Sequence, residues 1–172
     1  MTPGKLFPAT GRRVVILMDQ KGNRLAEYEL DSNKEPLFTF PRRITSTSEG
    51  NIFVVDRLNS DHKGRVVVLD PSGDVINTYS GHSDINNKEP FTPSDIITTA
   101  FNNIIVVDLN TETIHILDSK GHFIMYYSTN NLGIMHPHSV AISATGNFFI
   151  GCEAADDCPD KSKLYEVEFS GF

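Results

Sequence analysis

The chain has no tryptophan and only two cysteines among its 172 residues. Two thiols, Cys152 and Cys158, are too few for a cysteine-rich zinc module or a disulfide scaffold, so free thiols in a reducing compartment are expected. The apolar runs have the length of strands, and none approaches the roughly 20 residues of a membrane-spanning helix. The amino terminus has no signal-peptide core. We therefore predict a cytoplasmic protein that does not contact membranes.

Positive charge is also scarce, with 15 Lys and Arg against 22 Asp and Glu and a net charge of −7. An acidic body repels phosphate, which disfavours RNA binding unless a local basic patch forms. Arg12, Arg13, Arg42 and Arg43 could form one. There is neither a Gly-x-Ser-x-Gly nucleophile motif nor a phosphate-cradling glycine loop. These absences predict a protein that is not an enzyme and has no cofactor.

A repeated pattern occupies most of the chain. In each repeat a proline (Pro41, Pro93 or Pro137) ends a loop, and a short strand follows. A turn carrying glycine or asparagine, which tolerate positive φ, leads into an apolar strand rich in β-branched or aromatic residues. A third strand follows a loop of variable length. An all-strand unit that recurs after about 40–50 residues is typical of a β-propeller blade.

The third strand of each unit ends in a recurring turn. An acidic residue is followed three positions later by glycine, and an aspartate at the first turn position accepts backbone N–H groups. A structural role is therefore expected for Asp19, Gly22, Asp70, Gly73, Asp118, Gly121 and Gly171. The match at Asp19 places a partial unit before the first complete one.

The sequence predicts an all-β fold, a single propeller segment of four-stranded blades. A partial blade spans 12–30, complete blades span 40–80 and 92–128, and an incomplete blade spans 136–172. Six blades of about 45 residues need about 270 residues. We therefore expect an open, partial propeller of three to four blades, with a compressed four-bladed ring as the alternative. Because an open arc exposes strand edges, missing blades or self-association are expected.

The repeat resembles that of NHL-repeat propellers, in the segments 50–56 and 65–73 above all. The ending 163–172 resembles the carboxyl terminus of tripartite-motif (B-box) proteins of molluscs and other invertebrates. In that family a RING finger, B-box modules and a coiled coil precede the propeller, which binds substrate or RNA. The resemblance implies a module that recognises a protein partner or ubiquitination substrate. Ligase activity would belong only to the RING modules of a longer parent protein.

Partner binding is expected at one rim of the propeller. The connections there vary in length, whereas the turns of the opposite rim are short and constant, and loops on a rigid scaffold commonly carry binding sites. The candidate residues are Arg57, Asn59, His62, Lys63, Arg65, His82, Glu112 and His138. RNA binding is the alternative function. A metal-dependent hydrolase or lyase is the second alternative and requires at least three metal ligands at the channel mouth.

Other polar groups have a metal-binding and a structural interpretation. Asp56 and Asp108 end matching strands and could hold a cation, but a carboxylate that caps backbone N–H groups of its own loop is the favoured interpretation. The acidic stretch 153–160 lacks the alternating spacing of a calcium loop. His136 or His138 could ligate metal together with the cysteines, although loop histidines and free thiols are favoured. We predict no metal site.

Overall fold

Thirteen β-strands form four antiparallel sheets in the computed structural model, which describes residues 11–154 and 162–168. The first sheet pairs β1 (Val15–Met18) with β2 (Arg24–Tyr28). The second contains β3 (Pro41–Ser46), β4 (Ile52–Arg57), β5 (Gly64–Leu69) and β6 (Val75–Tyr79). The third contains β7 (Pro93–Thr98), β8 (Ile104–Asp108), β9 (Thr113–Leu117) and β10 (Phe123–Ser128). A 3-10 helix, η1 (Asn130–Leu132), precedes the last sheet of β11 (Pro137–Ile142), β12 (Phe148–Cys152) and β13 (Lys163–Val167).

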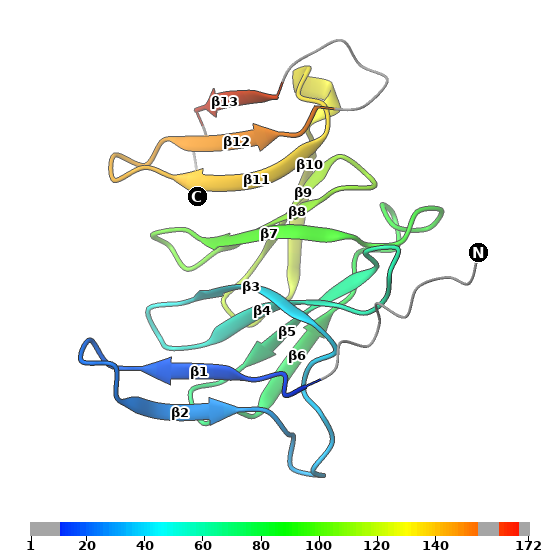
Figure 1. The fold of residues 1–172 in the computed structure, drawn as a ribbon. Coiled ribbons are helices and arrows are strands. Elements are labelled where there is room, and N and C mark those ends of the chain that lie inside the picture. Colours follow the sequence, from blue (N-terminus) through cyan, green and yellow to red (C-terminus); the bar gives the residue numbers. More distant parts are fainter. Residues whose placement is uncertain (1–10, 155–161, 169–172) are drawn as a thin grey trace.

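The four sheets are arranged in chain order around a common side of the molecule, each rotated relative to the one before it (Figure 1). Within each sheet, neighbouring strands are consecutive in the chain. The first strands of the last three sheets lie side by side, because β7 contacts both β3 and β11. The short hairpin turns lie at the left rim in Figure 1, and the longer connections lie at the right. The prediction of an all-β fold with open sheets is confirmed.

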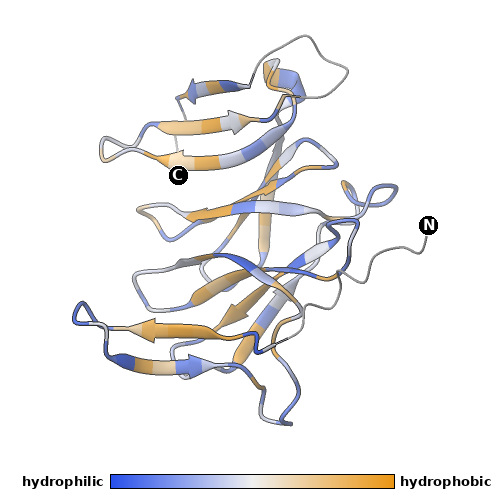
Figure 2. Ribbon diagram, in the orientation of Figure 1, coloured by the Kyte–Doolittle hydropathy of each residue, from blue (hydrophilic) through white to orange (hydrophobic). Residues whose placement is uncertain are grey.

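The hydrophobic core lies between the sheets. Successive side chains of a strand point to opposite faces, so β4 sends Val54 toward the first sheet and Phe53 toward the third. A second such interface joins the third sheet to the last, with Ile105 and Ile150 among its buried residues. Burial on both faces explains why the central strands are apolar at consecutive positions, as the orange strands of Figure 2 show. Each sheet is thus stabilised mainly by its immediate neighbours.

The three repeat prolines are the first residues of strands, one step inside the boundary that the sequence predicted. Pro41 lies opposite Asp56 and Pro93 lies opposite Asp108, and in both pairs the register shifts just after the proline. Proline is compatible with this place because a first strand residue at a sheet edge need not donate to the ladder. The irregular register leaves the residue after each proline outside the regular pairing.

The recurring turns are closed by their aspartates. Asp70 Oδ1 accepts the backbone N–H groups of Ser72, Gly73 and Asp74 at 2.9–3.0 Å. Asp19 and Asp118 each accept two N–H groups at 2.8 Å in the same way. The corresponding turn at Gly171 lies outside the described residues.

Turn glycines also permit close contact between sheets. Gly121 has a φ of +83°, and a Cβ atom added there would lie 2.7 Å from Val68 Cγ2 of the neighbouring sheet. Beside it, Asn77 Nδ2 donates to the carbonyl of Lys120 at 3.1 Å, and Asn51 Nδ2 donates to the carbonyl of Ser119 at 2.9 Å. The turn thus joins the second and third sheets.

Replacing Gly121 with alanine is expected to destabilise the protein more than replacing Gly146 does. Gly146 has a similar φ of +90°, but its added Cβ would meet nothing within 4 Å. Both variants suffer the backbone penalty of a left-handed alanine, about 1–2 kcal/mol. Only Gly121→Ala adds overpacking, which costs about 1–3 kcal/mol. Urea unfolding of both variants measures the difference, and equal losses would contradict the close-contact role.

Candidate partner-binding site

A basic pocket lies at the rim of long connections, where three sheets present the starts of their first strands. Its volume is about 190 Å³. β3, β7 and β11 each contribute the residue that follows the strand's initial proline. The remaining walls come from the end of β4, the β4–β5 loop and the segments after β8 and β12. The lining residues are Arg42, Arg57, His62, Pro93, Ser94, Leu109, His138 and Glu153.

The β4–β5 loop holds Arg57 and His62 in place. Asn59 Oδ1 accepts the N–H groups of Asp61 and Lys63, both at 3.1 Å. Arg57 Nε donates to the carbonyl of Asn59 at 2.8 Å and its Nη2 donates to the carbonyl of Ser60 at 2.6 Å. His62 itself has a φ of 65°, in the left-handed region. The loop is therefore pre-organised by its own hydrogen bonds.

Positive charge converges on this pocket. Burial, followed by the charges of Arg57 and Arg42, lowers the pKa of His62, while Asp61 opposes the shift. Burial and then Arg42 likewise lower the pKa of Arg57. Two guanidinium groups thus act on a neutral imidazole that would gain a proton only at reduced pH. Such a field favours an anion.

Two polar groups of the basic pocket have no partner among the residues that the structure describes. Ser94 Oγ is buried and makes no hydrogen bond. Within the described residues, no carboxylate oxygen lies within 4 Å of the Arg42 guanidinium, and the lining of the pocket includes one acidic residue, Glu153. A buried hydroxyl without a partner costs about 1–3 kcal/mol. Among the described residues, the pocket therefore offers a hydroxyl without a hydrogen-bond partner beside a guanidinium without a carboxylate partner.

The structure brings together three of the eight residues predicted for partner binding, namely Arg57, His62 and His138. Asn59 shapes the loop, and Lys63 lies in that loop without lining the pocket. Glu112 contacts His136, whose backbone N–H it accepts at 3.0 Å. The remaining two lie elsewhere: Arg65 pairs with Asp56 at 3.0 Å, and His82 stacks on Phe123 with ring centroids 4.0 Å apart.

Asp56 and Asp108 are fully buried and serve the chain itself. Asp56 Oδ1 accepts the N–H groups of Thr39 and Phe40 at 2.8 and 2.7 Å. Asp108 Oδ1 accepts both the N–H and the hydroxyl of Thr92, at 3.0 and 2.9 Å. These donors lie in the connection that precedes each sheet. The sequence had suggested N–H groups of the loop that follows each aspartate. Each carboxylate therefore fastens the crossing from one sheet to the next.

The arginines singled out for an RNA-binding patch are divided among different partners. Arg12 contacts Glu27 and Glu29, and Arg43 Nε lies 3.3 Å from Asp95 Oδ1. Arg42, by contrast, faces the basic pocket. Within residues 11–154 and 162–168 no three His, Cys, Asp or Glu side chains form a group that could hold a metal ion. The acidic stretch 155–160, with Cys158, lies outside the described residues.

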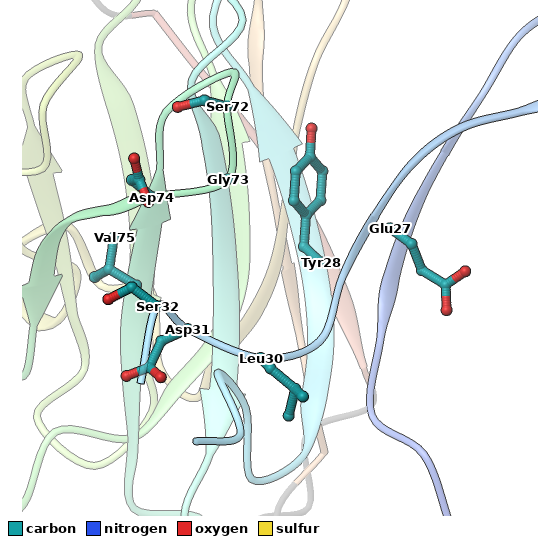
Figure 3. A pocket seen from close by; sticks show the side chains of 9 residues that line it. All are labelled: Glu27, Tyr28, Leu30, Asp31, Ser32, Ser72, Gly73, Asp74 and Val75. Carbon is teal, nitrogen blue, oxygen red and sulfur yellow. The ribbon is translucent and has the colours of Figure 1, made fainter. Parts of the chain in front are cut away.

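A second hollow, of about 580 Å³, lies between the first two sheets (Figure 3). Its carboxylates are Glu27, Asp31 and Asp74. Glu27 contacts Arg12, and Asp31 Oδ1 accepts the N–H groups of Asn33 and Glu35 at 2.8 and 2.9 Å. Figure 3 shows Glu27 on the opposite side of the view from Asp31 and Asp74. The carboxylates therefore do not converge on one point.

Sequence reasoning missed Arg42, Ser94 and Glu153 as pocket residues. A signal for two of them is present in the repeat, since Arg42, Ser94 and His138 each directly follow the proline that begins a first strand. The proline recurs while the next residue changes in every repeat. All three of these variable residues line the basic pocket.

No protein-family model and no curated protein matches the sequence. Solved structures are similar in fold. Hydrazine synthase of Kuenenia stuttgartiensis is 15% identical, with a TM-score of 0.61 over 90% of this chain and 40% of that chain. Virginiamycin B lyase of Staphylococcus aureus is 16% identical, with a TM-score of 0.55 over 91% and 50%. Regucalcin of Agrobacterium tumefaciens, a calcium-binding protein, is 14% identical, with a TM-score of 0.51 over 83% and 51%.

The chain therefore spans about half, or less, of the length of the solved structures that it matches. At these identities the likeness concerns the fold alone. No helix in the described part of the chain is long and apolar enough to cross a membrane. Four fanned antiparallel sheets and their propeller-like neighbours together establish that this chain has the fold of a partial β-propeller.

Proposed function

We propose that this chain is a partner-recognition module that binds a protein through the rim around the basic pocket. In the fuller form of the proposal, it is the NHL-type propeller of a tripartite-motif-like scaffold or ubiquitin ligase. The propeller would select the substrate, and RING modules outside this chain would carry the ligase activity. The resemblance of the repeat 50–73 and of the ending 163–172 supports this form of the proposal.

The basic pocket is the observation that carries the proposal. Two other charged side chains predicted for partner binding, Arg65 and Glu112, are engaged with the chain itself. In the basic pocket, Arg42 and Ser94 have donors that no other described residue uses, and they lie on a rigid base of three adjacent strands. Polar groups held ready on a rigid scaffold favour binding because little conformational entropy is lost.

Loop-rim variants should lose a binding partner that turn-rim variants keep. The test variant is Arg42→Ala with His62→Ala, and the matched control is Lys21→Ala with Lys120→Ala, which changes exposed residues of the opposite turns. Immobilised wild-type and variant proteins are compared by quantitative mass spectrometry of bound proteins. Each candidate is then purified and titrated against all three. We expect the test variant to weaken binding at least about tenfold, the effect of a lost charged contact.

Two outcomes contradict the proposal. One is a purified partner that binds wild type, test variant and control equally. The other is retention of RNA and of no protein, with RNA affinity that depends on Arg42. Circular dichroism of the test variant confirms that a loss of binding does not reflect unfolding.

A further inference from the structure

We propose that the basic pocket binds a single carboxylate of the partner, that of an acidic side chain. This inference rests on the proposed function and names the chemistry that the site selects. Its basis is the convergence of Arg42, Arg57, Ser94 and two histidines on one small cavity.

The size of the basic pocket suits a side-chain group. Sites for drug-sized molecules and cofactors usually occupy about 300–1,000 Å³, whereas this cavity holds about 190 Å³. That equals about six water molecules at a liquid volume of ~30 Å³ each. A carboxylate with part of its aliphatic stem fits such a space.

The donors of the basic pocket match a carboxylate. Arg42 brings a guanidinium that has no carboxylate partner in the described part of the chain. Guanidinium and carboxylate groups form strong, often two-pronged hydrogen bonds. Ser94 Oγ supplies a buried hydroxyl that has no hydrogen-bond partner within residues 11–154 and 162–168. An imidazole ring of His62 or His138 can add an N–H donor on another side.

Charge favours a carboxylate over phosphate. Glu153 forms part of the wall, so each negative charge of a ligand meets repulsion as well as attraction. A phosphate monoester carries about −1.5 to −2 at neutral pH, whereas a carboxylate carries one charge. A polyphosphate such as RNA would in addition bring many charges to a chain whose net charge is −7. The balance of one acidic wall against two arginines suits a single negative charge.

Ser94 gives the inference a distinctive signature. A hydroxyl that is buried without a partner destabilises the free protein. Ser94→Ala should therefore leave the unfolding midpoint unchanged or higher, while carboxylate affinity falls about two- to tenfold, the range of one neutral hydrogen bond. If Ser94 had a purely structural role, its replacement would lower the stability of the protein, and a fall in affinity without a fall in stability would not be seen.

The test uses the 172-residue chain and a blocked octapeptide that carries one glutamate among glycines and serines. Titrations are followed by NMR signals of the His62 and His138 imidazoles. The comparison ligands are the matching octapeptide with glutamine in place of the glutamate, inorganic phosphate and a ten-nucleotide oligouridine. We expect the acidic peptide to shift both imidazole signals saturably. We expect the amide peptide, phosphate and oligouridine to bind at least about tenfold more weakly. The amide peptide carries no negative charge for the arginines, whereas phosphate and oligouridine carry more negative charge than one carboxylate.

Arg42→Gln and Arg43→Gln form a matched pair on the same strand. Arg42 faces the basic pocket, whereas Arg43 pairs with Asp95. We expect Arg42→Gln to weaken the acidic peptide about tenfold or more and Arg43→Gln to leave its affinity unchanged. Arg57 is not a test position because its guanidinium holds the loop carbonyls of Asn59 and Ser60.

Affinity should also rise as pH falls from 8 to 5.5. The groups facing His62 are Arg42, Arg57, Asp61 and His138, and Glu153 shares the pocket with it. A bound carboxylate offsets the arginine charges and raises the pKa of His62, so binding takes up a proton while the peptide stays ionised. His62→Gln should flatten this dependence, and an unchanged slope would count against the assigned site.

The results separate the two proposals. If the amide peptide binds as well as the acidic one, or if Arg42→Gln has no effect on peptide affinity, the carboxylate inference is overturned. Partner recognition by the rim would still stand if the double variant Arg42→Ala with His62→Ala lost a purified partner. If the acidic peptide binds as expected and no partner depends on the rim, the carboxylate site stands and the recognition function fails.

Discussion

Replacing Asp56 with alanine is expected to destabilise the protein by about 3–5 kcal/mol, the usual cost of breaking a buried ion pair. The carboxylate is completely buried, with Arg65 Nε at 3.0 Å from Oδ2. Without this carboxylate, the N–H groups of Thr39 and Phe40 lose their acceptor and the Arg65 guanidinium loses its ion-pair partner. Since native domains are stable by about 5–15 kcal/mol, this one change would remove a large share of the total.

Urea unfolding followed by circular dichroism measures the effect of Asp56→Ala. Asp74→Asn is the control, because Asp74 is an exposed aspartate of a turn and such surface changes usually stay within about 0.5 kcal/mol. Asp56→Asn should fall between the two, since its amide oxygen can still accept one N–H group. If Asp56→Ala unfolded at the same urea concentration as Asp74→Asn, the role assigned to this carboxylate would be wrong.

Lowering the pH is expected to destabilise the protein because the buried imidazole of His115 resists protonation in the folded state. This loss should begin at a higher pH than the protonation of the carboxylates. The imidazole is fully buried, with Nδ1 2.7 Å from Tyr79 Oη and Nε2 2.9 Å from Thr113 Oγ1. Burial lowers the pKa of His115 to about 4, although Asp108, whose Oδ2 lies 3.7 Å from Nε2, acts in the opposite direction. We take the folded imidazole as neutral at pH 7, because two hydroxyl groups already satisfy both ring nitrogens.

The direction of the pH effect follows from proton binding. An unfolded histidine has a pKa of about 6.5, so the unfolded chain takes up a proton below that pH while the folded chain does not. Stability is therefore complete above about pH 6.5 and is lost progressively as pH falls toward about 4. The loss sums to about 3 kcal/mol over this window.

Unfolding free energies between pH 7 and pH 4.5 test this expectation. His115→Gln, which keeps a donor and an acceptor, should lower stability at pH 7 by about 1–3 kcal/mol and then show a flatter pH dependence. His122→Gln alters an exposed histidine and should retain the slope of the wild type. His62, whose pKa is also lowered, is present in both variants, so the comparison isolates His115. Parallel curves for all three proteins would refute the assignment.

The strands were predictable because their residues carry the signal locally. The run 104–108 is β-branched at four consecutive positions and follows an asparagine turn, and it forms β8. The inter-sheet contacts were less accessible to prediction. Nothing local in the sequence shows that Asn77 donates to a carbonyl 43 residues later, or that Asp56 caps a segment 16 residues earlier. Such pairings depend on the angle between sheets.

The sequence indicated the rim at which the basic pocket lies better than it indicated the residues that line this pocket. The variable connections indicated the rim at which the basic pocket lies, and His62 is in one of them. Arg42 and Ser94 are strand residues, so a search restricted to loops passed over them. Conversely, Arg65 and Glu112 look like free surface charges in sequence. In the structure Arg65 pairs with Asp56, which lies opposite it on the neighbouring strand β4, and Glu112 contacts His136, 24 residues later in the chain.

Because the short turns contact a neighbouring sheet, they tolerate inserted residues less well than the long connections of the opposite rim. A Cβ atom at Gly73 would lie 2.6 Å from Tyr28, and one at Gly121 would lie 2.7 Å from Val68. An inserted residue at either turn would wedge two sheets apart and tilt every sheet beyond it. On the other rim, doubling a flexible connection costs only about 0.6 kcal/mol. New specificities could therefore be acquired by insertions after β4 without rebuilding the scaffold.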